Sequence, residues 1–226
     1  MFNPYYLLKE KDEKIEKVEL DSVKRNFVQI FLKRFIDILF SSIALITLLP
    51  VFVIVAVCIF VDSPGSVIFS QYRIGKDGKP FKMYKFRSMV LNAESLLSSL
   101  QEKNEASGPM FKIKDDPRIT KVGKFIRKTS IDELPQLWNV LKGEMSLVGP
   151  RPALPSEVNQ YTKYQKYRLI VKPGCSGLWQ VCGRSQVGFD TMIYLDLIYI
   201  REQSIFLDFI IILETIKQMF CSKTAY

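Results

Sequence analysis

Residues 127–152 read RKTSIDELPQLWNVLKGEMSLVGPRP, and the expected fold and chemistry both centre on this stretch. Two adjacent carboxylates, Asp132 and Glu133, follow Ser130 at the point where a helix is expected to begin. A carboxylate there would lie beside free backbone N–H groups and the positive end of the helix dipole, which favour an ionised acid and also phosphate oxygens. An ionised Asp can attack phosphorus or bind a hard cation such as Mg²⁺.

A purely structural interpretation of the acid pair stands beside the chemical one. Ser130 with Glu133 three residues later matches a capping box, which needs no chemistry. Asp132 is a second candidate N-cap, since Pro135 then falls in the first turn, where no N–H is required. This stretch alone favours the structural interpretation. The other segments of the chain favour a catalytic role for the acid pair.

The helix expected after the acid pair has apolar residues at helical spacing, namely Leu134, Leu137, Trp138 and Leu141. This spacing predicts a buried face with Trp138 in the core. Gly143 suits the C-terminal cap of that helix. The turn at residues 149–152 then holds Arg151 between two prolines, and a stiff basic turn suits a phosphate clamp or, equally, a surface turn.

Composition and charge limit the classes of chemistry. The 226 residues carry a net charge of +9 and contain no histidine, which excludes Ser-His-Asp triads and histidine-ligated metal sites. The basic balance suits nucleic acid, anionic lipid or a phosphate-bearing substrate. The four cysteines form no C-x-x-C pair and no disulfide framework, which suits a reducing compartment.

An apolar segment, residues 38–61, contains no charged residue over 24 positions and predicts a membrane segment. A straight helix of this length would extend about 36 Å, against a hydrocarbon core of about 30 Å. Pro50 lies near its middle, lacks an N–H and is expected to kink or break the helix. Basic residues flank both ends, which fits a segment that enters the membrane and returns to the same face, although a kinked spanning helix remains open.

Residues 67–87 predict a β-hairpin with its turn at residues 76–80. Lys85 lies on the second predicted strand. Its side chain could bind phosphate, and the default interpretation is a solvated strand residue. Residues 92–107 and 157–171 are helix candidates. Asp115 and Asp116 resemble a metal-binding pair, but Asp-Asp before proline favours a turn.

The segment 172–185 is rich in glycine, which permits close backbone approach to a ligand. Trp179 and Arg184 in this segment could contact a nucleotide. Residues 192–220 are apolar and helical but carry too many charges to span a membrane. They suit helices that pack on the core or lie at the membrane surface.

Together these segments resemble the bacterial sugar transferase family, the small monotopic phosphoglycosyl transferases. The resemblance covers roughly residues 31–220 and leaves out residues 1–30. The segments that carry it are the apolar run broken at Pro50, SVIFSQYRIGKDGKPFKMYKFRSM, DPRITKVGKFIRKTSIDELPQLWNVLKGEMSLVGPRP, KPGCSGLWQVCGRS and LDLIYIREQSIFLDF. Cys175 and Ser176 depart from the usual Ile or Leu followed by Thr.

The resemblance implies a reaction: a sugar phosphate moves from a UDP-sugar to polyprenyl (undecaprenyl) phosphate, releasing UMP. Asp132 matches the nucleophile that forms an aspartyl phosphosugar, and Glu133 matches its partner, with Mg²⁺ bound at the pair. Lys85, Arg127 and Arg151 match basic residues around the phosphates. Such a transfer initiates polysaccharide or glycan synthesis, as in exopolysaccharide, lipopolysaccharide or capsule formation.

The expected fold is α+β and mostly helical. It combines a re-entrant membrane helix broken at Pro50, a small β-hairpin and surface-associated amphipathic helices around a cytoplasmic catalytic core. The expected divisions are a polar extension at residues 1–30, the re-entrant helix at 31–62 and the catalytic domain at 63–226. The resemblance implies a location at the bacterial inner membrane with the active site on the cytoplasmic face.

Two rival functions remain open. One is a membrane-bound glycosyltransferase that uses Asp115 and Asp116 for its metal and forms no covalent intermediate. The other is a non-enzymatic membrane adaptor whose positive charge binds lipid or nucleic acid. The expected partners are the UDP-sugar, polyprenyl phosphate and the bilayer, without nucleic acid; a homo-oligomer is left open. The stretch GPMFKIKDDPRIT suggests a hexose phosphate such as galactose or glucose.

Overall fold

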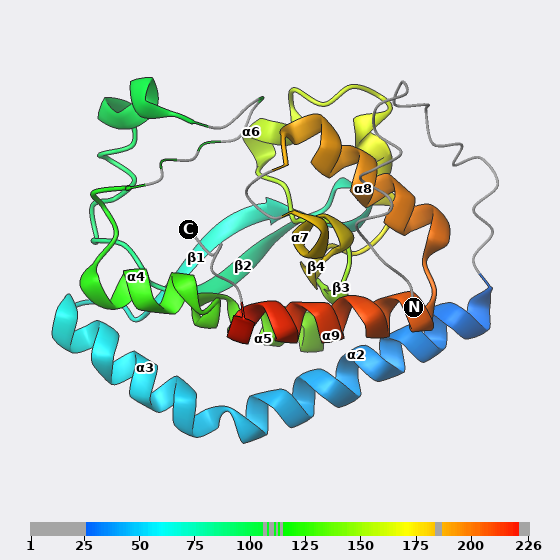
Figure 1. Cartoon of the computed structure of the whole chain (residues 1–226), viewed down its shortest axis with the longest axis horizontal. Helices are drawn as coiled ribbons and strands as arrows, with labels where there is room; N and C mark the ends of the chain where they lie inside the picture. Colours follow the sequence, from blue (N-terminus) through cyan, green and yellow to red (C-terminus); the bar gives the residue numbers. More distant parts are fainter. Residues whose placement is uncertain are drawn as a thin grey trace.

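The computed structural model describes residues 26–105, 108, 111, 113, 115–183 and 187–221 (Figure 1). The expected polar extension at residues 1–30 therefore lies almost wholly outside the described part of the chain. The described part is mostly helical and contains two small sheets, each of two strands, which confirms the α+β class.

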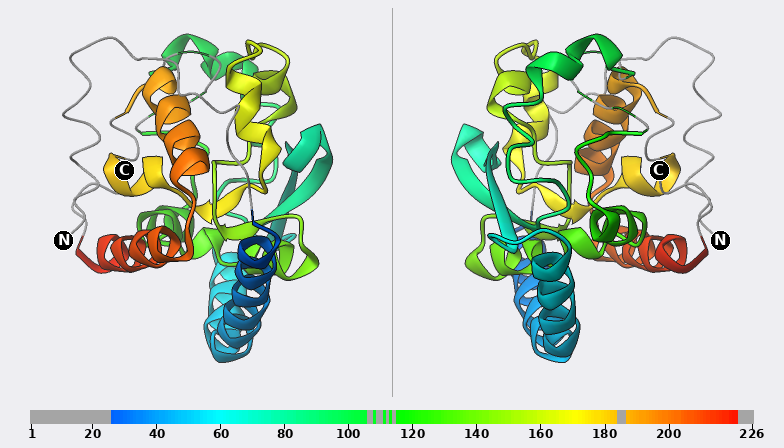
Figure 2. Two further views of the ribbon diagram at one scale, coloured as in Figure 1. Left: turned by 90° about the vertical axis from the view of Figure 1, so that its right-hand side faces the viewer. Right: turned by 90° about the vertical axis from the view of Figure 1, so that its left-hand side faces the viewer.

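Helices α2 (Phe27–Thr47) and α3 (Leu49–Asp62) form a V that projects from the rest of the molecule (Figures 1 and 2). The break falls at Leu48, and the two axes differ by 60°. Pro50 occupies the first turn of α3, where its missing N–H costs no hydrogen bond. The break expected near Pro50 is thus confirmed.

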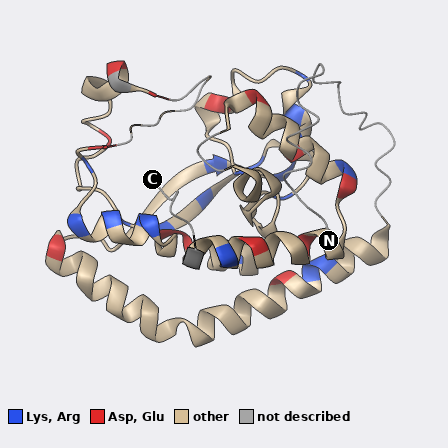
Figure 3. Ribbon diagram, viewed as in Figure 1, with Lys and Arg blue, Asp and Glu red and all other residues tan. Residues whose placement is uncertain are grey.

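Apolar side chains on both arms of the V face away from the protein, among them Phe35, Phe40, Ile54 and Phe60. Among the described helices, no single one is long and apolar enough to cross a bilayer, whereas α2 and α3 together are, apart from their bend. Figure 3 shows charged residues near the two ends of the V and none around its apex.

The predicted hairpin is present. Strands β1 (Ile68–Ile74) and β2 (Pro80–Phe86) pair antiparallel, with Ile68 opposite Phe86 and Ile74 opposite Pro80. The turn η2 (Lys76–Gly78) places Asp77 at φ 57° and Gly78 at φ 76°. Asp and Gly tolerate this left-handed region better than most residues, so the local sequence explains the turn.

A second sheet was not predicted. Strands β3 (Ser146–Val148) and β4 (Gly174–Ser176) pair in parallel, each over three residues. A Cβ on Gly174 would lie 2.0 Å from the backbone nitrogen of Gly149. The glycine at position 174 therefore allows two backbones to pack together, rather than a ligand to approach as the sequence suggested.

The main core forms around α8 (Phe189–Glu202), which is buried on almost every side. Helix α9 (Ile205–Cys221) packs against it with Leu207 and Ile211, and α7 (Leu178–Cys182) contributes Leu178 and Val181. The predicted helical segment 192–220 is confirmed, with a break at residues 203–204.

The opposite face of α9 is apolar and exposed. Phe206, Phe209, Leu213 and Ile216 follow one another at helical spacing and are 47–72% exposed. Helices α9, α4 (Lys121–Lys128) and α5 (Gln136–Lys142) lie at one level above the arms of the V (Figures 1 and 2). Within the segment 192–220, α9 is therefore the expected amphipathic helix, and α8 packs in the core instead.

Two helix predictions were wrong. Residues 92–105 form turns and the short 3-10 helix η3 (Ser98–Lys103), while Ser95 and Ser99 donate side-chain hydrogen bonds to carbonyls three residues back. Such bonds give the backbone an alternative to a regular helix. The segment 157–171 divides into α6 (Pro155–Val158) and the 3-10 helix η5 (Gln165–Ile170).

Candidate active site

The acid pair lies in a connection between two helices. Helix α4 ends at Lys128, Ser130 adopts a left-handed conformation at φ 57°, and the 3-10 turn η4 (Ile131–Glu133) carries both acids. Helix α5 begins only at Gln136, with Pro135 as its N-cap. Ser130 makes no side-chain capping bond, so the capping box is absent. Because Pro135 is the N-cap of α5, Asp132 is not that N-cap either. Both structural interpretations of the acid pair were therefore wrong.

Asp132 is a buried carboxyl group in a crowded electrostatic setting. Its residue surface is 8% exposed. Burial raises the pKa of Asp132 to about 6, against the attraction of Lys85; Glu133 raises it further, and Arg127 lowers it. Burial removes water from the carboxylate, and this desolvation penalises its ionised form. A partner that compensates the negative charge would therefore stabilise the ionised form of Asp132.

Lys85 reaches the acid pair from strand β2. Its Nζ lies 2.6 Å from Oε1 of Glu133, and both side chains remain partly exposed. Arg127, in the last turn of α4, adds a second positive charge that acts on Asp132. The structure therefore brings together four residues singled out from the sequence: Asp132, Glu133, Lys85 and Arg127.

Arg151 occupies the turn after β3, between the two prolines. Its Nη1 lies 3.3 Å from Oε1 of Glu157, whose side chain is 1% exposed. The other oxygen of Glu157 accepts the N–H of Leu154 at 2.9 Å. Arg151 is therefore held to one side of its own turn by a buried carboxylate.

A buried ion pair holds the backbone of the same turn. Arg168 on η5 donates from Nη2 to the carbonyl oxygen of Arg151 at 3.0 Å and pairs with Asp196 on α8. Burial raises the pKa of the Asp196 carboxyl, and a hydrogen bond from the backbone N–H of Arg151 opposes this rise. Arg168 and Asp196 thus position the Arg151 turn, a role that the sequence did not reveal.

Arg73 on β1 is a further basic residue of the site that the sequence analysis did not single out. Its Nη1 donates to the carbonyl of Pro152 at 3.1 Å, and its Nε is buried without a hydrogen-bond partner. Burial and the charge of Arg151 lower the pKa of Arg73 to about 10, while Glu157 and Glu133 oppose the shift. Arg73 is therefore within electrostatic range of both Arg151 and Glu133 of the acid pair. The signal in the sequence is a charged residue inside a predicted strand.

Asp132 and Glu133 are the candidate ligands for Mg²⁺ in the site. Within the described residues, no cluster of three or more His, Cys, Asp or Glu side chains could hold a metal. Asp132 and Glu133 together offer hard carboxylate oxygens, and Mg²⁺ is commonly bound by one or two carboxylates together with substrate phosphates and water. The pair fits this ion in the presence of a phosphate ligand.

Asp115 and Asp116 do not form a second metal site. Asp116 accepts hydrogen bonds from the backbone N–H and the guanidinium of Arg118, with Nη2 at 2.6 Å. Asp115 is exposed. The predicted turn is confirmed, because Asp116 closes it with its own side chain.

The glycine-rich segment contributes Cys175 near the site. Cys175 lies where Glu133 and Lys85 affect its thiol, and burial raises the pKa of that thiol. Trp179 has a buried Nε1 without a hydrogen-bond partner. Arg184 lies outside the described residues.

Helix α5 turns a different face inward than predicted. Trp138 is 51% exposed, whereas Gln136, Asn139 and Val140 are buried. Asn139 bonds to the hairpin backbone, accepting from the N–H of Tyr84 and donating to the carbonyl of Lys82. The expected core position of Trp138 was wrong, since a polar side chain docks this helix on β2.

Residues 28–222 match the model of a family described as bacterial sugar transferases. A galactosyl transferase of Streptococcus agalactiae serotype III is 52% identical over 186 residues, which cover 82% of this chain and 41% of that protein. An undecaprenyl-phosphate galactose phosphotransferase of Salmonella typhimurium is 44% identical over 200 residues, which cover 87% and 42%.

An exopolysaccharide production protein of Sinorhizobium fredii is 38% identical over 198 residues, covering 86% of this chain and 88% of that protein. The chain thus spans about two fifths of the length of the first two relatives and most of the third.

Proposed function

This chain belongs to the bacterial sugar transferase family, and we propose that it transfers a sugar 1-phosphate from a UDP-sugar to polyprenyl phosphate, with release of UMP. The observation that carries the proposal is the buried carboxyl of Asp132, flanked by the Glu133–Lys85 pair and by Arg127. A buried acid with a raised pKa among cations suits a nucleophile that attacks a phosphate group.

In the first step, an Asp132 carboxylate oxygen attacks the phosphorus that bears the sugar. A carboxylate–phosphorus bond forms, and the bond from phosphorus to the UMP oxygen breaks, so that UMP leaves with the electron pair. Burial raises the pKa of Asp132 to about 6, which still lies below neutral pH, so the ionised carboxylate is available at pH 7. It therefore needs no separate base for its attack.

In the second step, an oxygen of polyprenyl phosphate attacks the same phosphorus. The carboxylate–phosphorus bond breaks, Asp132 is regenerated, and the sugar is left on a polyprenyl diphosphate. Because the incoming phosphate is already ionised, no protein base has to remove a proton from it. One carboxylate therefore serves both halves of the reaction.

The basic residues of the site supply positive charge that offsets the negative charge developing on the substrate phosphates. Lys85 and Arg127 act electrostatically on Asp132, and Arg73 is affected by both Arg151 and Glu133. This arrangement suits a diphosphate, whose two phosphorus atoms need separate cationic partners. Mg²⁺ bound at Asp132 and Glu133 would neutralise charge on the phosphate oxygens.

We further propose that the α2–α3 pair enters the membrane and returns to the same face. Its 60° bend, its exposed apolar side chains and the charges near both of its ends support this topology. The exposed apolar face of α9 would then lie on the membrane surface. This arrangement keeps the catalytic part in the cytoplasm, where the soluble donor is, and next to the lipid acceptor.

The sugar is proposed to be a hexose, and the product to serve exopolysaccharide or capsule synthesis. Relatives are named as transferring galactose, glucose 1-phosphate and N-acetylgalactosamine phosphate. A panel of UDP-sugars, assayed for UMP release with polyprenyl phosphate and Mg²⁺, tests the whole function. UDP-galactose or UDP-glucose is expected to be the best donor. Absence of UMP release with every donor would contradict the proposal and favour a non-enzymatic adaptor.

The rival direct transfer would place the metal at Asp115 and Asp116. The engagement of Asp116 by Arg118 disfavours it, because both oxygens of that carboxylate accept hydrogen bonds from Arg118. Asp115→Ala is therefore expected to retain Mg²⁺-dependent UMP release. Loss of the Mg²⁺ dependence in this variant would instead support the rival.

A further inference from the structure

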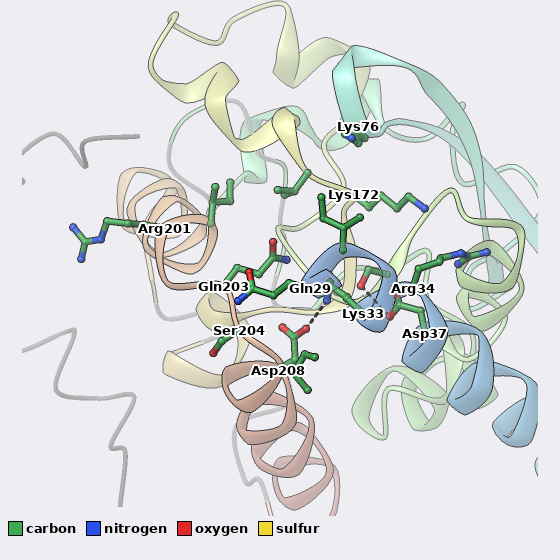
Figure 4. Close-up of a pocket in the computed structure, with 15 residues that line it drawn as sticks. Gln29, Lys33, Arg34, Asp37, Lys76, Lys172, Arg201, Gln203, Ser204 and Asp208 are labelled. Carbon is green, nitrogen blue, oxygen red and sulfur yellow. Dashed lines mark hydrogen bonds and ion pairs between the residues drawn. The ribbon is translucent and has the colours of Figure 1, made fainter. Parts of the chain in front are cut away.

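A second cavity, with a volume of about 250 Å³, lies where the first turns of α2 meet the junction of α8 and α9 (Figure 4). It is separate from the candidate active site, since neither Asp132 and Glu133 nor Lys85, Arg127 and Arg151 line it. We call it the α2 pocket. Its lining contains five basic and two acidic side chains.

Both carboxylates of the α2 pocket are already engaged. Asp208 pairs with Lys33 at 2.6 Å and accepts the hydroxyl of Tyr199 at 2.7 Å. Asp37 accepts the hydroxyl of Ser146 and the N–H of Leu147, each at 3.0 Å. Asp208 is therefore neutralised by Lys33, whereas Asp37 is held by two neutral donors and keeps its negative charge.

Three of the cations have little compensation. No carboxylate within the described part of the chain lies at ion-pair distance from Arg34 or Lys172, and Lys76 has only the exposed Asp77, at 3.9 Å. Arg34 donates to the carbonyls of Val140 and Leu141 at the end of α5. A helix end supplies only about half an elementary charge, so the pocket keeps a surplus of positive charge.

Two of these cations, Arg34 and Lys172, lie close together beside Gly143. A Cβ placed on Gly143 would lie 3.2 Å from Nη2 of Arg34 and 3.5 Å from Nζ of Lys172. Lys172 is half-buried, and its pKa is lowered by burial and by repulsion from Arg34, Lys76 and Lys33, while Asp37 opposes the shift. Figure 4 shows Arg34 and Lys172 pointing the same way, while Arg201 points away from the others. An anion bound between the Arg34 and Lys172 side chains would relieve their mutual repulsion.

One edge of the α2 pocket is apolar. Ile30 and Ile205 line it, and the neighbouring Phe206 is 72% exposed. Phe27, one turn before Ile30, is 79% exposed. A cationic interior beside an apolar edge suits an amphiphile whose head is a phosphate and whose chain follows α2 and α9.

We propose that the α2 pocket binds the phosphate headgroup of an anionic bilayer phospholipid. The lipid would bridge α2 to the junction of α8 and α9 and so stabilise the attachment of the V to the catalytic part. The inference rests on the proposed membrane association but not on the proposed chemistry at Asp132.

The test uses native mass spectrometry of the full chain in an uncharged detergent, with phosphatidylglycerol, phosphatidylcholine or inorganic phosphate added separately. The variants are Lys172→Ala and Lys76→Ala, the latter in an exposed turn that cannot disturb the core. Lys172→Arg tests rescue of the charge. Lys124→Ala, an exposed lysine on α4, is the matched control.

Wild type is expected to retain phosphatidylglycerol in preference to phosphatidylcholine. Each alanine variant at the pocket should weaken that retention about fivefold, Lys172→Arg should restore it, and Lys124→Ala should leave it unchanged. Equal weakening in Lys124→Ala and the pocket variants, or none in either, would overturn the proposal. Competition by free inorganic phosphate at equal affinity would overturn the lipid as occupant.

A further arm with polyprenyl phosphate separates a structural lipid from the acceptor substrate. Exclusive retention of polyprenyl phosphate would assign the pocket to the acceptor and contradict a bilayer lipid. UMP release is measured on the same preparations. Lipid retention without UMP release would count against the transferase proposal alone, and UMP release without selective retention would count against the α2 pocket alone.

Discussion

Nζ of Lys85 lies 2.6 Å from Oε1 of Glu133, so the lysine binds the neighbour of Asp132 rather than Asp132 itself. This contact joins strand β2 to the turn η4, two segments 48 residues apart in the chain. Through it, Lys85 neutralises the carboxylate that repels Asp132 while also attracting Asp132 directly. The acid pair and the lysine therefore form one electrostatic unit.

Lys85→Ala is expected to lower UMP release about a hundredfold at neutral pH, because it removes a charge aimed at the phosphates. Lys85 also lowers the pKa of Asp132, so its loss should raise that pKa and move the acidic limb of the kcat/KM profile to higher pH. Lys82→Ala, an exposed lysine on the same strand, is the control. An equal loss in both variants, with no shift of the limb, would contradict this role.

Glu133→Gln is expected to move the acidic limb in the opposite direction. Glu133 raises the pKa of Asp132, so removing its charge favours ionisation and shifts the limb to lower pH, below the wild-type value of about 6. The variant should also need more Mg²⁺ for half-maximal UMP release, because one carboxylate ligand is lost. An unchanged pH profile and Mg²⁺ requirement would show that Glu133 acts neither on Asp132 nor on the metal.

Arg168→Met is expected to lower the free energy of unfolding by about 3–5 kcal/mol, because it leaves the buried Asp196 without its cation. The double variant Arg168→Met/Asp196→Leu should recover part of that loss, since no buried charge remains unpaired. Denaturant titration of the full chain in detergent measures both. Additive losses in the double variant would contradict a coupled pair.

Gly174→Ala is expected to disrupt the β3–β4 sheet, because the new Cβ would lie 2.0 Å from the backbone nitrogen of Gly149. Since Arg151 follows that sheet, KM for the UDP-sugar should rise together with the loss of stability. Gly78→Asn is the contrast: Gly78 has φ 76° but no atom within 4 Å of its Cβ position. Asn tolerates this conformation, so the cost there should stay below about 1 kcal/mol. Equal effects at the two positions would rule out the steric explanation.

Local signals in the sequence predicted the elements that depend on local chemistry. Pro50 marked the break between α2 and α3, Asp77-Gly78 marked the hairpin turn, and Gly143, at φ 84°, ends α5 as expected. Each of these residues acts through its own backbone preference. No long-range contact was needed to place them.

Features that depend on long-range contacts were missed. The three-residue strands β3 and β4 are too short for a periodic signal. Asn139 is buried because it bonds to the hairpin, so a hydrophobic pattern assigned the inner face of α5 to Trp138 instead. Arg73 and Arg168 are buried charges whose partners lie far along the chain, and their sequence neighbours give no hint of burial.

The most direct measurement of the central claim is intact-protein mass spectrometry of wild type and Asp132→Asn with Mg²⁺ and the preferred UDP-sugar, without lipid acceptor. The account predicts a sugar-phosphate adduct on wild type that disappears when polyprenyl phosphate is added, and no adduct on Asp132→Asn. UMP release after addition of the acceptor, with no adduct on wild type under any condition, would contradict the covalent role of Asp132.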